Sequence, residues 1–322
     1  MRLFFFIPTA HLPNKDQSDD WVNGRMPVMT RGKTATALNW LYQTWLELRN
    51  ISDVHLVSDL PESGLIITMS NFLGTGFRAS SRQFIAAVAA DYLPHSGAHV
   101  QLVQNAAHLH RLPGAIFMPL WPQPSLIPRN PLRGATMETV AFLGDSKNLA
   151  PKLRSPEFSE RLKRETGATL ELREIARWHD YSDVDAVLAI RDFSSLKHLH
   201  KPGTKLINAW LAGVPLIGGR ESSFAAIGKE GRDYLIARSV NHSIAIVQRL
   251  RDDHCLYGRI VEEGKKSSIP FARTAVVNRW KSFCNEVFPN LYRRWQTKSP
   301  LERNLYWLRQ RGLLYLDRKL RS

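Results

Sequence analysis

Residues 201–221, KPGTKLINAWLAGVPLIGGRE, carry the pattern that decides the fold. Apolar side chains at 206, 207, 210 and 211 recur at helical spacing. Gly213 follows them at the position where a glycine commonly ends a helix. The apolar run at 214–217 is typical of a strand covered on both faces of a parallel sheet. The stretch therefore predicts a helix, a glycine stop and a buried strand, which belong to one α/β crossover.

Two lysines, Lys201 and Lys205, stand near the start of this predicted helix. The first N–H groups of a helix have no partner within the helix, and the helix dipole places positive charge at the same end. Ammonium groups beside such an end favour an anionic ligand, and phosphate fits best. The alternative is an ordinary crossover helix with solvated lysines.

Strand and helix signals alternate along the rest of the chain, which predicts βαβ units and parallel sheets. Ser155 and Pro156 form an N-cap and a first-turn proline, and Gly167 closes the same helix. Apolar runs of strand length occur at 3–7, 54–57, 65–68, 100–103, 140–143, 170–172, 186–190 and 234–236. Helical patterns occur at 34–48, 80–90, 155–167, 243–250, 256–265 and 272–287, the last ending before Pro289.

A proline-rich stretch at 113–131 separates two groups of these elements. Six prolines in nineteen residues exclude a helix or a central strand there. The stretch therefore predicts a semi-rigid connector between domains. We expect an N-terminal α/β domain at 1–132, a C-terminal α/β domain at 133–288 and a helical tail at 289–322.

The formal charge of the 322 residues is +15, which implies an anionic partner. Residues 293–322 hold nine Lys or Arg against two Asp or Glu, a net charge of +7. Nearly half of the excess charge thus lies in the tail, which argues against a nucleic-acid groove spread over the fold. Cys255 and Cys284 have no metal-ligand spacing and suit a reducing cytosol, so we expect a cytoplasmic protein.

The tail itself predicts a basic amphipathic helix. Ser299 to Glu302 form a capping box with a proline at the first helical position. Leucines then recur at near-helical spacing among arginines, with Gly312 as an interruption. Such a helix either lies on an anionic membrane surface, here the inner face, or docks on the N-terminal domain.

Ligands of open α/β sheets bind beyond the carboxyl ends of the strands. Arg191 follows the expected strand 186–190, and Glu221 and Ser222 follow the strand at 214–217. Arg191 and Lys205 could converge on a diphosphate, while Glu221 suits a sugar or ribose hydroxyl. The alternatives are a surface salt bridge for Arg191 and a position beside a helix cap for Glu221.

The segment KPGTKLINAWLAGVP resembles the donor-site helix of GT-B nucleotide-sugar glycosyltransferases. Many of them carry Lys-Pro-x-x-Lys-Leu, an acidic residue, Ala, two to three further residues and then Ala-Gly-x-Pro at this helix. Asn208 stands where those enzymes usually have a glutamate that touches donor hydroxyls. The resemblance implies two Rossmann-like domains whose parallel sheets face each other across a cleft. The matching residues are Lys201, Pro202, Lys205, Leu206, Ala209, Ala212, Gly213 and Pro215.

The resemblance also implies a function, which is transfer of a sugar from a nucleoside-diphosphate sugar to a glycan, lipid-linked or small-molecule acceptor. The diphosphate would be held by Arg191 and Lys205, with Lys201 as a neighbour and without a metal or other cofactor. The only Asp-x-Asp, Asp183 to Asp185, precedes its strand. The metal-binding Asp-x-Asp of the other large glycosyltransferase fold follows a strand, so a structural role is expected here.

Candidates for catalysis come from two regions of the N-terminal half. His108 follows the strand at 100–103, where related enzymes often place a histidine beside the donor sugar; its neighbour His110 is the rival. An inverting reaction needs a general base, and His11, Asp19 and Asp20 in the long N-terminal loop are candidates. A retaining reaction needs no such side chain. The alternative function is a non-catalytic α/β protein that binds a nucleotide or sugar, which Asn208 in place of an acidic residue favours.

Overall fold

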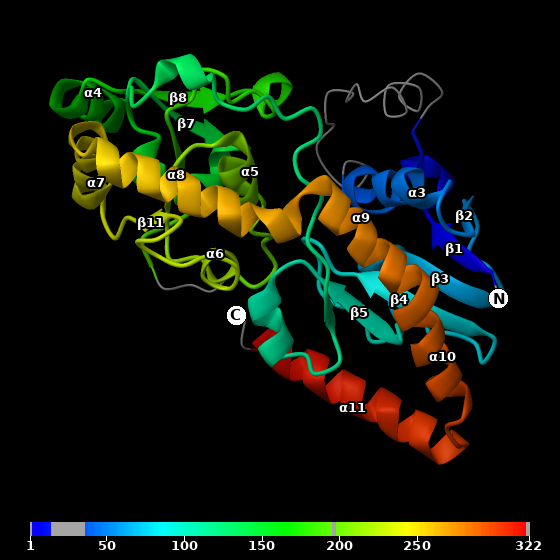
Figure 1. Cartoon of the computed structure of the whole chain (residues 1–322). Coiled ribbons are helices and arrows are strands. Elements are labelled where there is room, and N and C mark those ends of the chain that lie inside the picture. Colours follow the sequence, from blue (N-terminus) through cyan, green and yellow to red (C-terminus); the bar gives the residue numbers. More distant parts are fainter. Residues whose placement is uncertain (1, 14–35, 195–197, 320–322) are drawn as a thin grey trace. The chain divides into compact units, whose positions relative to one another are not determined.

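The computed structural model describes residues 2–13, 36–194 and 198–319. The chain divides into two compact units, each built from separate stretches of sequence (Figure 1). The first unit holds Met1–Trp121, Leu199–Pro202 and Arg273–Ser322, and the second holds Pro122–His198 and Gly203–Ala272. The first change of unit therefore falls inside the proline-rich stretch at 113–131.

The first unit contains a six-stranded, all-parallel sheet in the order β2-β1-β3-β4-β5-β6. Its central strands are buried on both faces, as in other covered parallel sheets. The strands are β1 (Leu3–Phe6), β2 (Val54–Val57), β3 (Gly64–Met69), β4 (Gln83–Val88), β5 (Val100–Val103) and β6 (Ile116–Phe117).

The helix expected at 80–90 was a wrong prediction, because this segment forms β4. A short, uninterrupted apolar run has neither a 2.0 nor a 3.6 period, so its pattern does not separate a strand from a buried helix. Hydrogen bonding to β3 and β5 on its two sides stabilises the segment as a strand.

The last helices of the chain complete the core of the first unit. They are α9 (Arg273–Ser282), a π-helical turn (Phe283–Val287), α10 (Phe288–Gln296) and α11 (Pro300–Lys319). Trp280, Phe288 and Trp295 are buried in the same cluster as β1, β3, β4 and β5, which also packs against α3 (Gln43–Leu48). The helix expected to end before Pro289 instead continues to Gln296. Pro289 is tolerated because it stands in the first turn of α10, directly after the wider π-turn.

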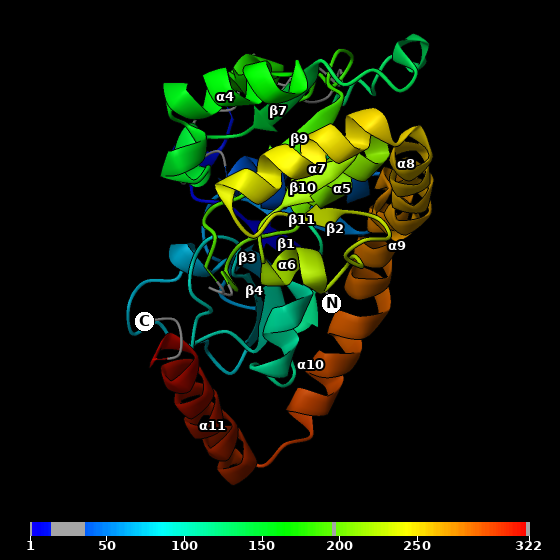
Figure 2. The same cartoon turned by 90° about the vertical axis from the view of Figure 1, so that its left-hand side faces the viewer.

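The second unit contains a five-stranded parallel sheet in the order β11-β10-β9-β7-β8. Figures 1 and 2 show α4 beside α7, and α5 along α8. The strands are β7 (Thr139–Leu143), β8 (Thr169–Arg173), β9 (Ala186–Ala189), β10 (Leu216–Gly218) and β11 (Leu235–Ile236). The helices are α4 (Pro156–Thr166), α5 (Thr204–Ala212), α6 (Ser222–Ala225), α7 (Val240–Asp252) and α8 (His254–Ser268).

Local signals placed the ends of these helices correctly. Ser155 Oγ accepts a hydrogen bond from the Phe158 N–H at 3.3 Å, and Gly167 ends α4 with φ 76°. Gly213 ends α5 with φ 72°, a conformation that only glycine adopts at little cost. The expected strand, glycine and helix positions of this unit are thus confirmed.

The order of the strands has one consequence for ligand binding. From β7 the chain first adds β8 on one side and then β9, β10 and β11 on the other. The connections therefore leave the sheet in opposite directions between β7 and β9, and such a point is where open α/β sheets have an accessible crevice.

His99, directly before β5, is a titratable residue that is buried in the first unit. Its ring is 6% exposed, and its Nδ1 accepts a hydrogen bond from the Ile85 N–H at 3.1 Å. The rings of Phe84 and Trp295 lie 4.4 and 4.7 Å from it, centroid to centroid. Burial, together with the positive charge of Arg303, lowers the pKa of His99 to about 3.

We expect His99 to make the free energy of unfolding depend on pH between about 6.5 and 3. In this range the unfolded histidine binds a proton that the folded one does not, so stability falls as pH falls, by about 1.4 kcal/mol per pH unit. In His99→Gln a carboxamide oxygen can accept the same N–H bond, and this share of the slope should vanish. Urea unfolding at a series of pH values measures it. His254→Gln, at an exposed position, is the control, and equal slopes for His99→Gln and the natural protein would contradict the assignment.

Candidate functional site

Polar residues gather beyond the carboxyl ends of β7, β9 and β10. Asn148 lies in the turn after β7, Arg191 follows β9, and Glu221 follows β10. These three strands are neighbours in the sheet, in the order β10-β9-β7. The topology therefore brings side chains from three distant stretches of sequence to one edge.

Arg191 is held between the other two side chains. Its Nη1 donates to Asn148 Oδ1 at 2.6 Å, and its Nε donates to Glu221 Oε2 at 3.2 Å. The Arg191 side chain is 16% exposed and that of Glu221 only 5%. A buried carboxylate needs a partner, and this pair also fixes the plane of the guanidinium. Among the described residues, Arg191 Nη2 takes part in no hydrogen bond, so this nitrogen can donate to a ligand.

Lys205, the second residue of α5, reaches back to the end of β7. Its Nζ lies 5.1 Å from the centroid of the Phe142 ring, within the range of a cation–π contact. A Cβ placed on Gly144 would lie 2.7 Å from the same Nζ, so the ammonium group would have to shift. Gly144 therefore makes room for the ammonium group. The sequence signal for it, a glycine directly after a buried strand, was visible but was not assigned to the site.

Two buried hydroxyl groups stand at the starts of α5 and α6. Thr204 Oγ1 and Ser223 Oγ have no hydrogen-bond partner among the described residues. A Cβ on Gly203 would lie 3.2 Å from the Ser223 backbone oxygen, so the starts of the two helices meet. An unsatisfied buried hydroxyl costs about 1–3 kcal/mol, which a bound polar group or a water molecule can offset. Sequence reasoning selected Ser222, the first residue of α6, and missed both of these hydroxyls.

Comparisons with known proteins bear on this arrangement. No protein-family model matches the sequence, and no curated protein matches it. Among solved structures, that of Anabaena HepE in complex with UDP has a TM-score of 0.56 and 13% sequence identity, covering 88% of this chain and 99% of HepE. AviGT4, a glycosyltransferase involved in avilamycin A biosynthesis, has a TM-score of 0.51 and 12% identity, covering 90% of this chain and 98% of AviGT4.

The chain has the GT-B fold. Two parallel α/β sheets and a C-terminal helical segment, as expected from the sequence, are confirmed. At 10–13% identity the likeness to HepE and AviGT4 establishes the GT-B fold and nothing finer. No helix in the described ranges is long and apolar enough to cross a membrane.

Asn208 lies on α5, and its side chain forms hydrogen bonds to other residues of the second unit. It is 6% exposed, and its Oδ1 accepts a hydrogen bond from the Gln123 N–H at 3.0 Å. Its carboxamide also bonds to the buried hydroxyl of Tyr181. Asn208 thus attaches the segment that begins the second unit to α5, and its role in binding a donor stays a prediction.

Lys201 belongs to the first unit. Its Nζ donates to Asp91 Oδ1 at 2.8 Å, and the lysine side chain is 24% exposed. The residues that the structure brings together at the candidate site of the second unit are therefore Arg191, Glu221 and Asn148, with Lys205 at Gly144.

The two catalytic candidates within the described residues, His108 and His11, lie apart from each other in the first unit. His108 is 2% exposed, and its Nε2 lies 3.0 Å from Asp317 Oδ1, so the pair fastens α11 to the turn after β5. His11 stacks on Phe72 with ring centroids 4.9 Å apart. His11 follows β1 and His108 follows β5, and β3 and β4 separate these strands. Asp20, like Asp19, lies outside the described residues, and all these roles stay predictions.

The Asp-x-Asp pair has structural partners. Asp185 is fully buried and accepts hydrogen bonds from Arg129 at 2.7 Å and from Arg133 at 2.7 Å. Burial opposes its charged form, but bonds from Arg133, from the N–H groups of Thr139 and Glu138, and from Arg129 hold the pKa of Asp185 below its usual value. Within the described ranges no cluster of three or more His, Cys, Asp or Glu side chains could hold a metal ion.

Proposed function

We propose that this GT-B protein is a glycosyltransferase that takes its sugar from a nucleoside-diphosphate sugar. The observation that carries the proposal is the pair of cations at the switch point of the second sheet: Arg191 after β9 and Lys205 at the end of β7. Each charge-assisted hydrogen bond to a diphosphate contributes about 1.5–3 kcal/mol. The solved complexes of HepE with UDP and with UDP-glucose support UDP as the first nucleotide to test.

The two cations have a direct role in the proposed reaction. An acceptor hydroxyl attacks the anomeric carbon of the donor sugar, the bond from that carbon to the diphosphate oxygen breaks, and the hydroxyl proton passes to a base. Negative charge then grows on the leaving diphosphate. Positive groups already fixed at that place stabilise the transition state more than the ground state. Glu221 and Asn148 hold the Arg191 guanidinium in place, so this group needs to move little as the charge on the diphosphate grows.

We further propose that these side chains make transfer independent of a metal ion, and that the acceptor is a glycan, a lipid-linked molecule or a small molecule. The base is proposed among His108, His11 and Asp20. A cytoplasmic location is proposed from Cys255 and Cys284, both of which are free thiols. For a lipid-linked acceptor, a peripheral position on an anionic membrane surface is part of the same proposal.

A non-catalytic binding protein is the second candidate function. Asn208 favours this function, because its amide stands where an acidic residue is usual in GT-B glycosyltransferases. The same amide is hydrogen-bonded to Gln123 and Tyr181. Such a protein would bind the nucleotide and leave the donor intact.

Two measurements test the proposal. Isothermal titration should show binding of UDP or GDP, and absence of binding to either would contradict it. A panel of nucleotide sugars, assayed by release of the diphosphate with and without added acceptors, should show turnover. Slow donor hydrolysis without acceptor separates the enzyme from the pure binder, which gives none.

A further inference from the structure

The helix α11 has one face fixed to the first unit. Leu314 and Asp317 are 4% and 2% exposed. The hydroxyl of Tyr306 donates to the His99 backbone oxygen, and the Trp307 ring lies 4.8 Å from the His99 ring. Trp295 of α10 contacts both of these aromatic residues of α11. The orientation of α11 about its own axis is thereby fixed.

The opposite face of α11 presents a stripe of large apolar side chains to solvent. Their spacings of four, three, seven and one residues place them on one side of a helix. Single exposed apolar residues need no explanation, but a continuous stripe of them does. We call this set the leucine stripe: Leu301, Leu305, Leu308, Tyr315 and Leu316, which are 68%, 56%, 63%, 58% and 56% exposed.

Cations stand on both flanks of the leucine stripe, each beside a hollow. On one flank Arg309 lines a hollow of about 440 Å³ together with Arg294 and Lys298. On the other flank Arg311 lines a hollow of about 550 Å³ together with Arg78. Of the described residues, no Asp or Glu lines either hollow. Arg309 and Arg311 are exposed, and none of the ion pairs of the described residues includes either of them.

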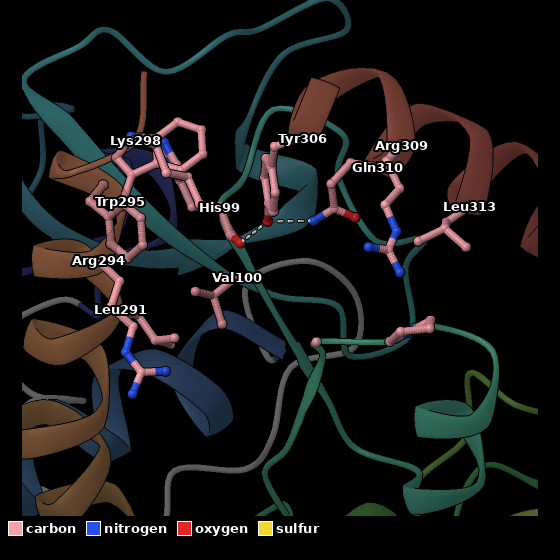
Figure 3. Close-up of a pocket in the computed structure, with 13 residues that line it drawn as sticks. His99, Val100, Leu291, Arg294, Trp295, Lys298, Tyr306, Arg309, Gln310 and Leu313 are labelled. Carbon is pink, nitrogen blue, oxygen red and sulfur yellow. Dashed lines mark hydrogen bonds between the residues drawn. The ribbon is translucent and has the colours of Figure 1, made fainter. Parts of the chain in front are cut away.

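Apolar and cationic side chains together line the first hollow. Figure 3 shows Leu291, Trp295 and Arg294 from α10 on one side, and Tyr306, Arg309 and Leu313 from α11 on the other. Phe84, Val100 and Pro113 also line the hollow. A cavity of this size can take one small group or chain end. Cations beside apolar side chains match an anionic headgroup joined to a hydrocarbon chain.

We propose that this face of the first unit binds the surface of an anionic lipid bilayer. The leucine stripe enters the boundary between headgroups and acyl chains, and lipid phosphates lie against Arg309 and Arg311 on its flanks. This inference deepens the peripheral position proposed above, and it assigns that position to named residues of α11. Its residues are not those of the nucleotide site, so the two proposals can fail separately.

Co-sedimentation of the full-length protein with vesicles tests the inference. We expect binding to phosphatidylcholine vesicles that contain about one third phosphatidylglycerol, weaker binding at higher salt, and none to pure phosphatidylcholine. Arg309→Gln with Arg311→Gln should weaken binding by roughly 30-fold, since each cation near an anionic surface contributes a factor of about five. Leu305→Ser with Leu308→Ser should weaken it by at least about tenfold.

Matched controls change the same chemistry elsewhere. Arg249→Gln with Arg259→Gln removes the same net charge from α7 and α8, and Leu132→Ser alters a leucine that is 92% exposed. Both should leave vesicle binding unchanged. Equal loss in the controls, or no loss in the α11 variants, would overturn the inference.

Two further outcomes would overturn it in other ways. A dimer in analytical ultracentrifugation that Leu305→Ser with Leu308→Ser dissociates, without vesicle binding, would make the stripe an interface between two copies. Binding of glycerol phosphate alone, without vesicle binding, would make the first hollow a site for free phosphate. UDP titration of each variant should be unchanged, which keeps failure of the lipid inference distinct from failure of the glycosyltransferase proposal.

Discussion

Replacing Lys205 with methionine is expected to weaken UDP binding by about 10- to 100-fold and to lower sugar transfer at least as much. The methionine keeps the apolar stem against Phe142 but removes the charge that Gly144 admits to the end of β7. Loss of one charge-assisted bond of about 1.5–3 kcal/mol gives this range. Isothermal titration with UDP measures the affinity, and thermal unfolding checks that the fold is retained.

A second variant tests the geometry without changing the charge. In Gly144→Ala the new Cβ would lie 2.7 Å from the Lys205 Nζ, so the ammonium group must move. We expect a smaller loss of UDP affinity than in Lys205→Met. Lys266→Met, at a lysine that is 70% exposed on α8, is the matched control and should bind UDP normally. Normal binding by both site variants would show that the nucleotide does not occupy this end of β7.

Replacing Asp185 with asparagine is expected to destabilise the second unit by about 3–5 kcal/mol. Asp185 is the shared partner of Arg129, whose side chain is 6% exposed, and of Arg133. Removing the carboxylate leaves buried positive charge without compensation, which is costly. Denaturant unfolding measures the change. Asp53→Asn, at a side chain that is 82% exposed, is the control and should change stability little.

The same residue predicts acid sensitivity. The pKa of Asp185 is lower in the folded protein than the value of about 3.9 in an unfolded chain. Its contribution is therefore complete above about pH 4 and is lost as pH falls further, because the unfolded state binds the proton first. The stability difference between the natural protein and Asp185→Asn should shrink below pH 4. A difference that stays constant would contradict this role.

Local sequence signals predicted much of the second unit because they act within a few residues. The caps at Ser155, Gly167 and Gly213 need only their own turn of chain. Two predictions for the first unit were wrong, and in both cases the observed structure depends on residues that are distant in the sequence. The strand β4 is decided by pairing with its neighbours in the sheet, and the helix across Pro289 depends on a π-turn before it and on packing into the first core.

The candidate site was found in outline for the same reason and missed in detail. The rule that ligands bind at strand ends selected Arg191 and Glu221. Their pairing with each other and with Asn148 joins residues up to 43 positions apart, which no local pattern encodes. The motif around Asn208 lies within α5, whereas its partner Gln123 lies 85 positions away. The burial of the Thr204 and Ser223 hydroxyls depends on the meeting of two helix starts, which no local pattern encodes.

The closure of the first core by the last helices sets an order for folding during synthesis. All six strands of the first sheet are made by residue 117, but Trp280, Phe283, Phe288 and Trp295, which share its core, follow more than 150 residues later. In the interval the ribosome makes the whole second unit, which needs no residue beyond Ala272. Nascent domains fold as units when their sequence is complete. The unit that begins the chain is therefore the last to fold, and its sheet must be kept from aggregation, by a chaperone or by the ribosome itself, until the final helices emerge.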